Sequence, residues 1–481
     1  MAESPDNTPR PAGYDPPPDL FDELDQLPQE TPDPERLWGM SDRLQHIRRY
    51  ALCCLTSPWA VLGATLIRVS CATEPNIQLP ALVATKASLN LFVALVGASG
   101  TGKSGAMDVA EEMLIPRLAG SNTPIPIPAL PLGSGEGLSD IYVRLPPRLP
   151  RRGQQEDGIG EDALGLGVAG AVQHCTRALV VAEEVDTIDA QVRRSGSTLM
   201  QQLRLAWSGG QLGHAYRDET KRIQVPKHAY RMGLLVGVQP GRGAALLDDA
   251  DGGTPQRFLW LPATDPGLVE NPEDFAEPLP VTIPQYVRGA TFRVWPPVRQ
   301  VVRKARLDRN KGLAEALDGH ALLTRLKVAA ALVLLHDGWW GDEALDISEQ
   351  AWYAAGLVMA KSDQTRESVR QYLSEAAQAA NVQQGRARAT QEVIVAEVTE
   401  EAAEARLETR VQRLAAKLAN RIADRGKTTE DRWVAHRVLN QGAAAADRKH
   451  LLDALARLEA LGQVEVRDGG HHARHYRIRL E

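Results

Sequence analysis

The spacing of apolar positions divides the chain into a first part in which strands and helices alternate and a second part that is helical. Four nearly continuous apolar runs, each of strand length, lie at residues 89–96, 178–182, 232–238 and 257–261. Strands that are apolar on both faces belong to a parallel sheet with helices on each side. Residues 105–118 and 196–207 show helical spacing between these runs. The pattern therefore predicts an α/β fold built on a parallel sheet.

Strand signals end near residue 290, and helical spacing continues from there. Residues 312–336 and 347–361 predict amphipathic helices. Residues 364–424 contain almost no glycine or proline, and they predict one or two long helices. The last part of the chain predicts two helices, near 430–439 and over 446–461, and then a hairpin. This is the order of elements in a winged helix.

The first candidate site directly follows the first apolar run, where the sequence reads Gly-Ala-Ser-Gly-Thr-Gly-Lys-Ser. Its glycines permit backbone conformations that a side chain would forbid, so the N–H groups can surround phosphates at the start of a helix. Lys103 is expected to contact the β- and γ-phosphates, and Ser104 to hold Mg²⁺. ATP and Mg²⁺ are therefore the expected ligands. The predicted nucleotide-binding residues are Gly97, Ala98, Ser99, Gly100, Thr101, Gly102, Lys103 and Ser104.

Carboxylates that complete such a site are expected at the end of a neighbouring strand. Glu183 and Glu184 follow the apolar run 178–182. Glu183 is predicted to bind Mg²⁺, directly or through water, and Glu184 to orient the attacking water. Gln239 ends the next apolar run, where a polar side chain can contact the γ-phosphate.

An arginine is expected to stabilise the charge on the transferring phosphoryl group. Arg257 is the first candidate and Arg242 the alternate. An arginine that completes the site of a neighbouring subunit requires a homo-oligomer, and a hexameric ring is one such form.

A chain of 481 residues is too long for a single core. The first 35 residues are acidic and rich in proline, which is typical of disorder, and their apolar positions could bind a replication-protein partner. The predicted domains are a disordered acidic tail (1–35), an N-terminal helical segment (36–88), a P-loop ATPase core (89–285), a helical domain (286–365), a long helical linker (366–425) and a winged-helix domain (426–481).

Together these motifs resemble a family of helicase-like P-loop ATPases from phages, plasmids and integrated elements of high-GC bacteria. The resemblance covers about residues 40–365. The segments that carry it are Ser57-Pro-Trp-Ala-Val-Leu62, Ala87-Ser-Leu-Asn-Leu91, Gly97–Ser104, Gly133–Leu138, Ala182–Asp186, Gly237-Val-Gln-Pro240, Gly252-Gly-Thr-Pro-Gln-Arg-Phe-Leu-Trp260 and Asp318-Gly-His-Ala321. The resemblance implies a RecA-like or DnaB-like core and a role in replicating a mobile element. It also implies a second candidate for the catalytic base, Glu136, because in such ATPases the base lies on the strand after the P-loop helix.

The net charge of −6 excludes a uniformly basic protein that coats nucleic acid, but it permits local basic surfaces. Four cysteines without a CxxC pair, and a polar N-terminus, indicate a cytoplasmic protein without disulfides. No apolar run reaches the about 20 residues that a membrane span needs, so no membrane partner is expected.

The basic surface is expected in the winged helix. Arg448, Lys449 and Arg457 lie on its second predicted helix, and Arg467 and Arg474 lie in its hairpin, where they could contact DNA. The leading hypothesis is an ATP-hydrolysing DNA motor, a replicative helicase or helicase loader. The alternatives are an ATP-switched replication initiator or regulator and a defence-type ATPase. Winged helices also bind proteins, so DNA is not the only partner that this domain allows.

Overall fold

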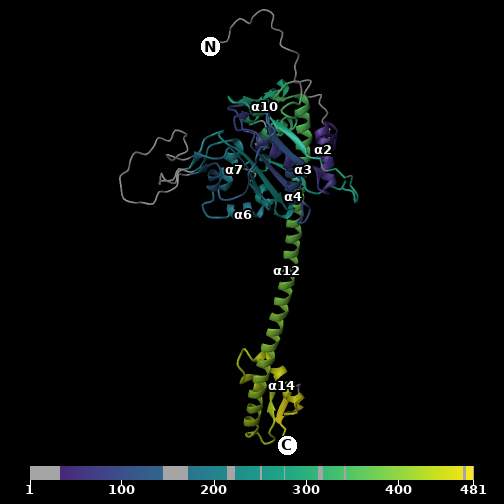
Figure 1. The fold of residues 1–481 in the computed structure, drawn as a ribbon. Helices are drawn as coiled ribbons and strands as arrows, with labels where there is room; N and C mark the ends of the chain where they lie inside the picture. The colour runs from purple at the N-terminus through teal and green to yellow at the C-terminus, as the bar shows by residue number, and fades with distance from the viewer. Residues whose placement is uncertain are drawn as a thin grey trace, which may run out of the picture. The chain divides into compact units, whose positions relative to one another are not determined.

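The computed structural model describes residues 33–144, 172–213, 223–249, 252–272, 274–275, 277–312, 318–340, 343–469 and 473–479. The predicted acidic tail lies almost entirely outside these residues. The chain forms two compact units, Met1–Ala376 and Ala377–Glu481. The boundary falls inside one helix, α12 (Glu349–Gly426), and each unit is described separately below (Figure 1).

The first unit contains a five-stranded sheet in which every neighbouring pair is parallel. In spatial order its strands are β11 (Phe258–Pro262), β2 (Leu91–Val96), β10 (Arg231–Val238), β7 (Arg177–Ala182) and β4 (Ala129–Pro131). Four of the five correspond to the four apolar runs, so the predicted α/β fold with a parallel sheet is confirmed. The fifth strand, β4, is short and largely exposed, and the apolar pattern does not reveal it.

Each face of this sheet has its own hydrophobic core. Along β2, Leu91, Val93 and Leu95 point into one core, and the residues between them point into the other. Helices α3 (Pro58–Ala72), α4 (Lys103–Met113) and α11 (Asp318–Leu335) contribute to the first core. Helices α6 (Asp186–Val192), α7 (Leu199–Ser208) and α8 (Ala244–Leu247) contribute to the second. Both faces are therefore covered, as a parallel sheet requires.

Helix α3 is the most deeply buried helix in the first unit, with all 15 of its residues buried. It comes from the predicted N-terminal helical segment, and it contacts four of the five central strands. Glycines allow the close approach. A Cβ at Gly63 would lie 2.5 Å from Leu261 Cδ1, and one at Gly233 would lie 2.6 Å from Cys71 Sγ. A sheet and a helix can pack this tightly only where one partner has no side chain.

The remaining elements of the first unit are short or peripheral. They are η1 (Pro34–Gly39), α2 (Asp42–Cys53), β1 (Ile77–Gln78), β3 (Leu114–Leu118), α5 (Gly137–Asp140), β5 (Val143–Arg144), β6 (Val172–Gln173), β8 (Leu212–Gly213), β9 (Gln224–Val225), η3 (Pro240–Arg242), α9 (Thr254–Arg257), β12 (Leu279–Ile283), β13 (Ala290–Thr291), β14 (Arg293–Val294), α10 (Pro296–Asn310) and β15 (Asp346–Ile347). The helix predicted over 105–118 is wrong at its end, because Pro116 cannot continue a helix and residues 114–118 instead form β3, which pairs with β12.

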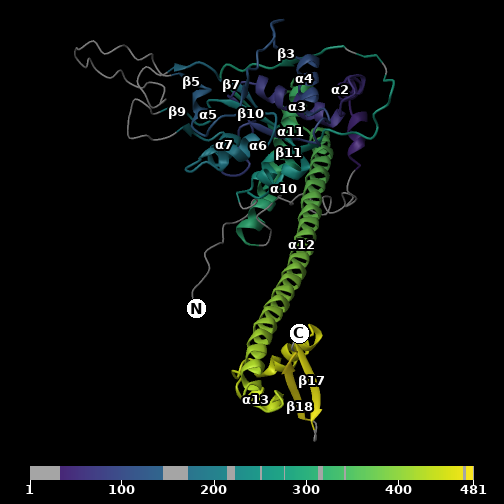
Figure 2. The ribbon, with the colours of Figure 1, turned by 90° about the horizontal axis from the view of Figure 1, so that it is seen from below.

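The second unit consists of the last part of α12, three short helical segments and a small antiparallel sheet. Its further elements are β16 (Val434–Ala435), α13 (His436–Gln441), η4 (Arg448–His450), α14 (Leu451–Ala460), β17 (Val464–Gly469) and β18 (Ala473–Ile478), several of which are labelled in Figure 2. The strand order is β16-β18-β17. Leu414, Leu418 and Ile422 of α12 form its core together with Leu455 and Leu458 of α14.

Two sequence predictions for this unit are shifted. The helix expected from residue 446 begins at Leu451, after a 3-10 turn, and the helix expected near 430–439 begins only at His436, after the strand β16. The long stretch 364–424, by contrast, lies within one continuous helix. In the described part of the chain, no helix is both long enough and apolar enough to cross a membrane.

Two buried cations that donate to backbone carbonyl groups hold the edge at which the central strands begin. Arg231 is fully buried, and its guanidinium donates to the carbonyl oxygens of Thr73 (3.3 Å), Glu74 (2.8 Å) and Ile77 (2.7 Å). Lys327 of α11 donates to the carbonyl oxygens of Asn90 (2.7 Å) and Trp207 (2.5 Å). These bonds satisfy carbonyl groups that burial would otherwise leave without a donor.

We expect Arg231→Met to destabilise the first unit by about 3 kcal/mol or more, because buried carbonyl groups lose their donor. Urea denaturation, followed by tryptophan fluorescence, measures the change. Arg242→Met is the matched control, since its side chain is 66% exposed. Equal unfolding midpoints for the two variants would contradict the role given to Arg231.

Candidate phosphate-binding site

The loop between β2 and α4 has the geometry expected of residues 97–104. Gly100 and Gly102 have φ values of 79° and 82°, in the left-handed region that favours glycine. Gly97 is required for a different reason, since a Cβ there would lie 2.2 Å from Thr101 Oγ1. The loop leads directly into α4, whose first N–H groups have no partner within the helix and attract anions.

Lys103 is the first residue of α4, and its side chain is turned back over the loop. Its Nζ donates to the carbonyl oxygens of Gly97 (2.8 Å) and Ala98 (2.7 Å), and only 9% of the residue is exposed. Burial lowers the pKa of Lys103, and the nearby charge of Glu184 partly opposes this shift. The ammonium group is therefore held at the centre of the loop, close enough to Glu184 for the two charges to attract each other.

The two glutamates follow β7, at the same edge of the sheet as the loop. Strand β10 lies between β2 and β7, and its end is tightly packed against both. Val185 N–H donates to the Gly237 carbonyl (2.8 Å). A Cβ at Gly237 would lie 2.0 Å from the Glu183 carbonyl oxygen and 3.5 Å from Lys103 Cε. Gly237 therefore allows the Glu183 backbone to approach the end of β10 closely, and Lys103 lies in ordinary contact beside it.

A cavity of about 460 Å³ lies beside the loop. Ser104 and Glu183, the two predicted Mg²⁺ ligands, both line it, together with Asp108 and Thr187. Among the described residues there is no group of three or more His, Cys, Asp or Glu side chains arranged to hold a metal. Magnesium does not require one, because it keeps several waters and uses one or two carboxylates together with substrate phosphates. Ser104 and Glu183 fit that mode of binding.

The two candidate bases differ in their distance from the loop. Neighbouring strands lie about 4.8 Å apart, so β7 is about 10 Å from β2 and β4 is about 14 Å away. Glu136 follows β4 and caps the short helix α5. Glu184 follows β7, and it is the acid that affects the pKa of Lys103. The strand order and the charge effect on Lys103 both favour Glu184 as the acid nearer the loop.

Gln239 directly follows β10, next to the end of β2, where the Gly97 N–H donates to the Val238 carbonyl (2.9 Å). The segment that follows packs against the first part of α12. A Cβ at Gly243 would lie 2.4 Å from Val369 Cγ1. Arg242, in the same segment, lies 3.8 Å from Asp186 and is largely exposed.

Arg257 lies away from the loop. It directly precedes β11, which runs parallel to β2 with Phe258 beside Phe92, so it is at the edge where the strands begin. The residue is 8% exposed, and its guanidinium donates to the Gly252 carbonyl and lies over the Trp207 ring. Arg257 therefore cannot reach the loop of its own chain. It could serve a neighbouring subunit only by leaving these contacts.

The five arginine and lysine residues predicted to contact DNA have different environments in the second unit. Arg457 pairs with Glu408 of α12, and Arg467 pairs with Asp431 (2.6 Å). Arg474 lies 3.8 Å from Asp468. Arg448 donates to the Ala443 carbonyl (3.3 Å) from the turn before α14. Lys449 is exposed in the same turn. Arg457 and Arg467 are therefore less available to a ligand than their sequence positions suggest.

Sequence reasoning missed Arg68. It is the one charged residue of α3, it lines the cavity beside Ser104 and Glu183, and it pairs with Glu111 of α4. Its relative exposure is 7%. A single arginine within an otherwise uncharged, buried helix was the available signal, since a buried cation requires a partner or a ligand.

We expect Gly237→Ala to weaken triphosphate binding by about ten- to a hundred-fold, because the new methyl group must separate the end of β10 from the Glu183 backbone and so displace the two glutamates. Titration with a fluorescent ATP analogue measures the loss. Gly133→Ala is the control, since a Cβ there would meet nothing within 4 Å. If both variants bind like the wild type, the packing at Gly237 does not matter for the site.

His320, beside Arg257, predicts a dependence of stability on pH. Burial, with further contributions from Arg257, Arg309 and Lys327, lowers its pKa from 6.5 to about 4. The unfolded state therefore binds a proton that the folded state excludes, so stability is complete above pH 6.5 and is lost as the pH falls to about 4. The loss is on the order of 3 kcal/mol. Denaturant unfolding curves measured from pH 4 to pH 7 should show that His320→Gln lacks this pH-dependent loss of stability. If the variant has the same pH profile as the wild type, the role given to His320 is wrong.

A scan against protein-family models finds no match for this chain, and a search of curated proteins finds no significant relative.

Proposed function

We propose that this protein is an ATP-hydrolysing, DNA-associated motor with a RecA-like P-loop core, a replicative helicase or helicase loader of a phage or mobile element. The observation that carries the proposal is the loop 97–104. It joins a buried parallel strand to a helix, two of its glycines adopt left-handed backbone, and Lys103 is held over it. Loops of this kind bind the phosphates of nucleoside triphosphates.

The acids at the same edge support hydrolysis over simple binding. Lys103 would neutralise the β- and γ-phosphates, and Ser104 and Glu183 would hold Mg²⁺, which supplies further neutralisation of the phosphate charge when bound. Glu184 is close enough to Lys103 to affect its pKa, and it is exposed enough to contact a water molecule. We assign it the role of orienting that water and keep Glu136 as the second candidate.

The second unit supports the association with DNA. A helix, a short strand, two helices and a two-stranded hairpin follow one another, with the strands in one antiparallel sheet. We interpret this order of elements as a winged helix, which would place a helix in a major groove and its hairpin beside it. Lys449, in the turn before α14, and Arg474, in the hairpin, are exposed and would contact phosphates.

Two alternatives differ in what ATP does. In an ATP-switched initiator or regulator, the nucleotide changes the conformation and turnover is slow. In a defence-type ATPase, hydrolysis does not respond to DNA.

We expect wild-type protein to hydrolyse ATP faster when single-stranded DNA is added, and Lys103→Ala to hydrolyse none at a measurable rate. The reason is that Lys103 is the only side-chain cation in the loop. Phosphate release, measured with and without DNA, checks both statements. Lys227→Ala is the control, since this residue is exposed and lies outside the site.

Hydrolysis that depends on Lys103 but ignores DNA would exclude the motor and favour the switch or the defence ATPase. Hydrolysis that is equal in the wild type and Lys103→Ala would contradict the assignment of the loop itself.

A further inference from the structure

Helix α10 is strongly basic. Its 15 residues include Arg299, Arg303, Lys304, Arg306 and Arg309, and only one carboxylate, Asp308. Arg299, Arg303 and Arg306 follow each other at intervals of four and three residues, so they lie on one face and span about 10 Å. All three are exposed. The mixed charge of an ordinary surface helix, with acids between the bases, is absent from this face.

These arginines have no acidic partner among the residues that the structure describes. The ion pairs of the first unit involve other cations, such as Arg43, Arg68 and Arg293. Like charges on successive turns repel each other and lower stability. A polyanion would remove this repulsion and release its own counterions, which makes its binding favourable at low salt.

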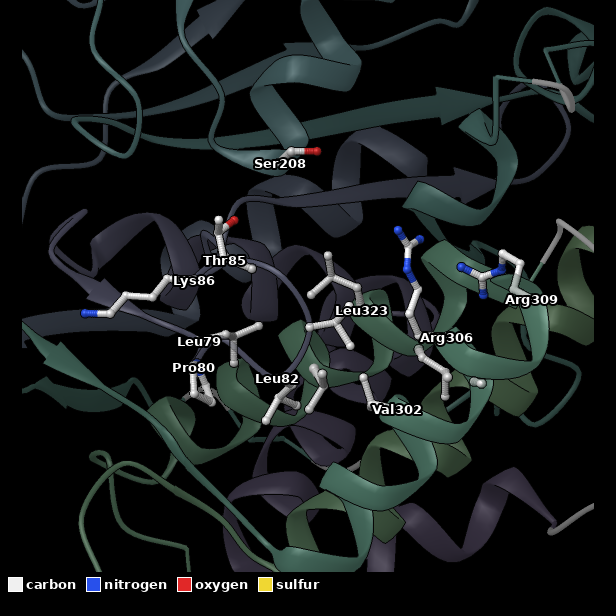
Figure 3. Close-up of a pocket in the computed structure, with 15 residues that line it drawn as sticks. Leu79, Pro80, Leu82, Thr85, Lys86, Ser208, Val302, Arg306, Arg309 and Leu323 are labelled. Carbon is white, nitrogen blue, oxygen red and sulfur yellow. The ribbon is translucent and has the colours of Figure 1, made fainter. Parts of the chain in front are cut away.

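A cavity of about 260 Å³ adjoins the basic face. Figure 3 shows the guanidinium groups of Arg306 and Arg309 at one end and the Lys86 ammonium group at the other, with apolar side chains between them. The apolar part is formed by Leu79, Leu82, Val302, Leu322, Leu323 and Leu326. Its chemistry suits a ligand that alternates between anionic groups and flat, less polar groups.

We infer that α10 and this cavity bind single-stranded nucleic acid, with phosphates on Arg299, Arg303 and Arg306 and an unstacked base in the cavity. A duplex keeps its bases stacked and offers none to the cavity. An anionic membrane fits less well, because the apolar side of α10 packs into the protein through Val298 and Val302 and is not free to insert. This surface belongs to the first unit, whereas the proposed winged helix belongs to the second.

The test is the binding of a fluorescently labelled 20-nucleotide oligothymidylate to the full chain, measured by anisotropy over a range of salt concentrations. The variant is R299Q/R303Q/R306Q. The matched control is R386Q/R388Q/R406Q, which removes three exposed cations from α12. Losing three phosphate contacts on a single strand lowers the salt slope by about 2, and it weakens binding on the order of 100-fold at 0.1 M salt. The control should bind like the wild type, and both variants should melt like it.

Four competitors define the ligand, namely oligouridylate of equal length, a blunt duplex, an abasic strand, and vesicles of phosphatidylserine. The inference expects oligouridylate to displace labelled oligothymidylate from the α10 site. If oligouridylate binds more tightly than oligothymidylate, the natural ligand is RNA, and if it binds less tightly, the ligand is DNA. The duplex and the abasic strand should compete less well. Equal losses in the two triple variants, or no loss in either, would overturn the inference. The inference would also be overturned if vesicles displaced the labelled strand and if the abasic strand and the duplex competed as well as unlabelled oligothymidylate.

The inference depends on the proposed function only in the choice of a nucleic acid as ligand, and the two can fail separately. Lys103→Ala leaves α10 unchanged. Loss of strand binding in the α10 variant, in a protein that hydrolyses no ATP, would support the surface and refute the motor. Normal strand binding in the α10 variant, with hydrolysis that depends on Lys103 and on DNA, would refute the surface alone.

Discussion

The central constraint on this fold is that all neighbouring strands of its main sheet run in the same direction. Each connection must then return from the end of one strand to the start of another and cover a face of the sheet on the way. Both faces of the sheet are buried as a result. This explains why the strands are apolar along their whole length and why helix α3 has no exposed residue. The same constraint collects all the strand ends at one edge and all the strand starts at the other.

The two edges differ in chemistry because of this sorting. The edge at which the strands end contains the loop with the buried Lys103, the exposed acids Glu183 and Glu184, and the half-buried Gln239. The edge at which the strands begin contains cations that are buried on carbonyl oxygens, Arg231 and Lys327. The first edge has room for a ligand and the second is closed by its own side chains. Because the strands all run in one direction, the candidate site residues lie at one edge of the sheet and the structural cations lie at the other.

Much of this arrangement could be predicted from the sequence where one segment determines its own structure. The four apolar runs and the glycine-rich loop are such segments, since burial on both faces and left-handed backbone leave local signatures. The environments of β4, Arg257 and Arg457 could not be predicted, because each depends on a distant partner. β4 is a strand only beside β7, Arg257 is buried by Trp207, and Arg457 is neutralised by Glu408. No local pattern contains that information.

The close packing of Gly243 against Val369 has a mechanical consequence. A methyl group at Gly243 would overlap the valine, so the segment after β10 cannot move toward α12 without pushing it. An α-helix bends little over a few turns. A small displacement at the end of β10, where Gln239 lies, would therefore tilt the first part of α12 as a rigid lever, with Val369 near the point where the force is applied.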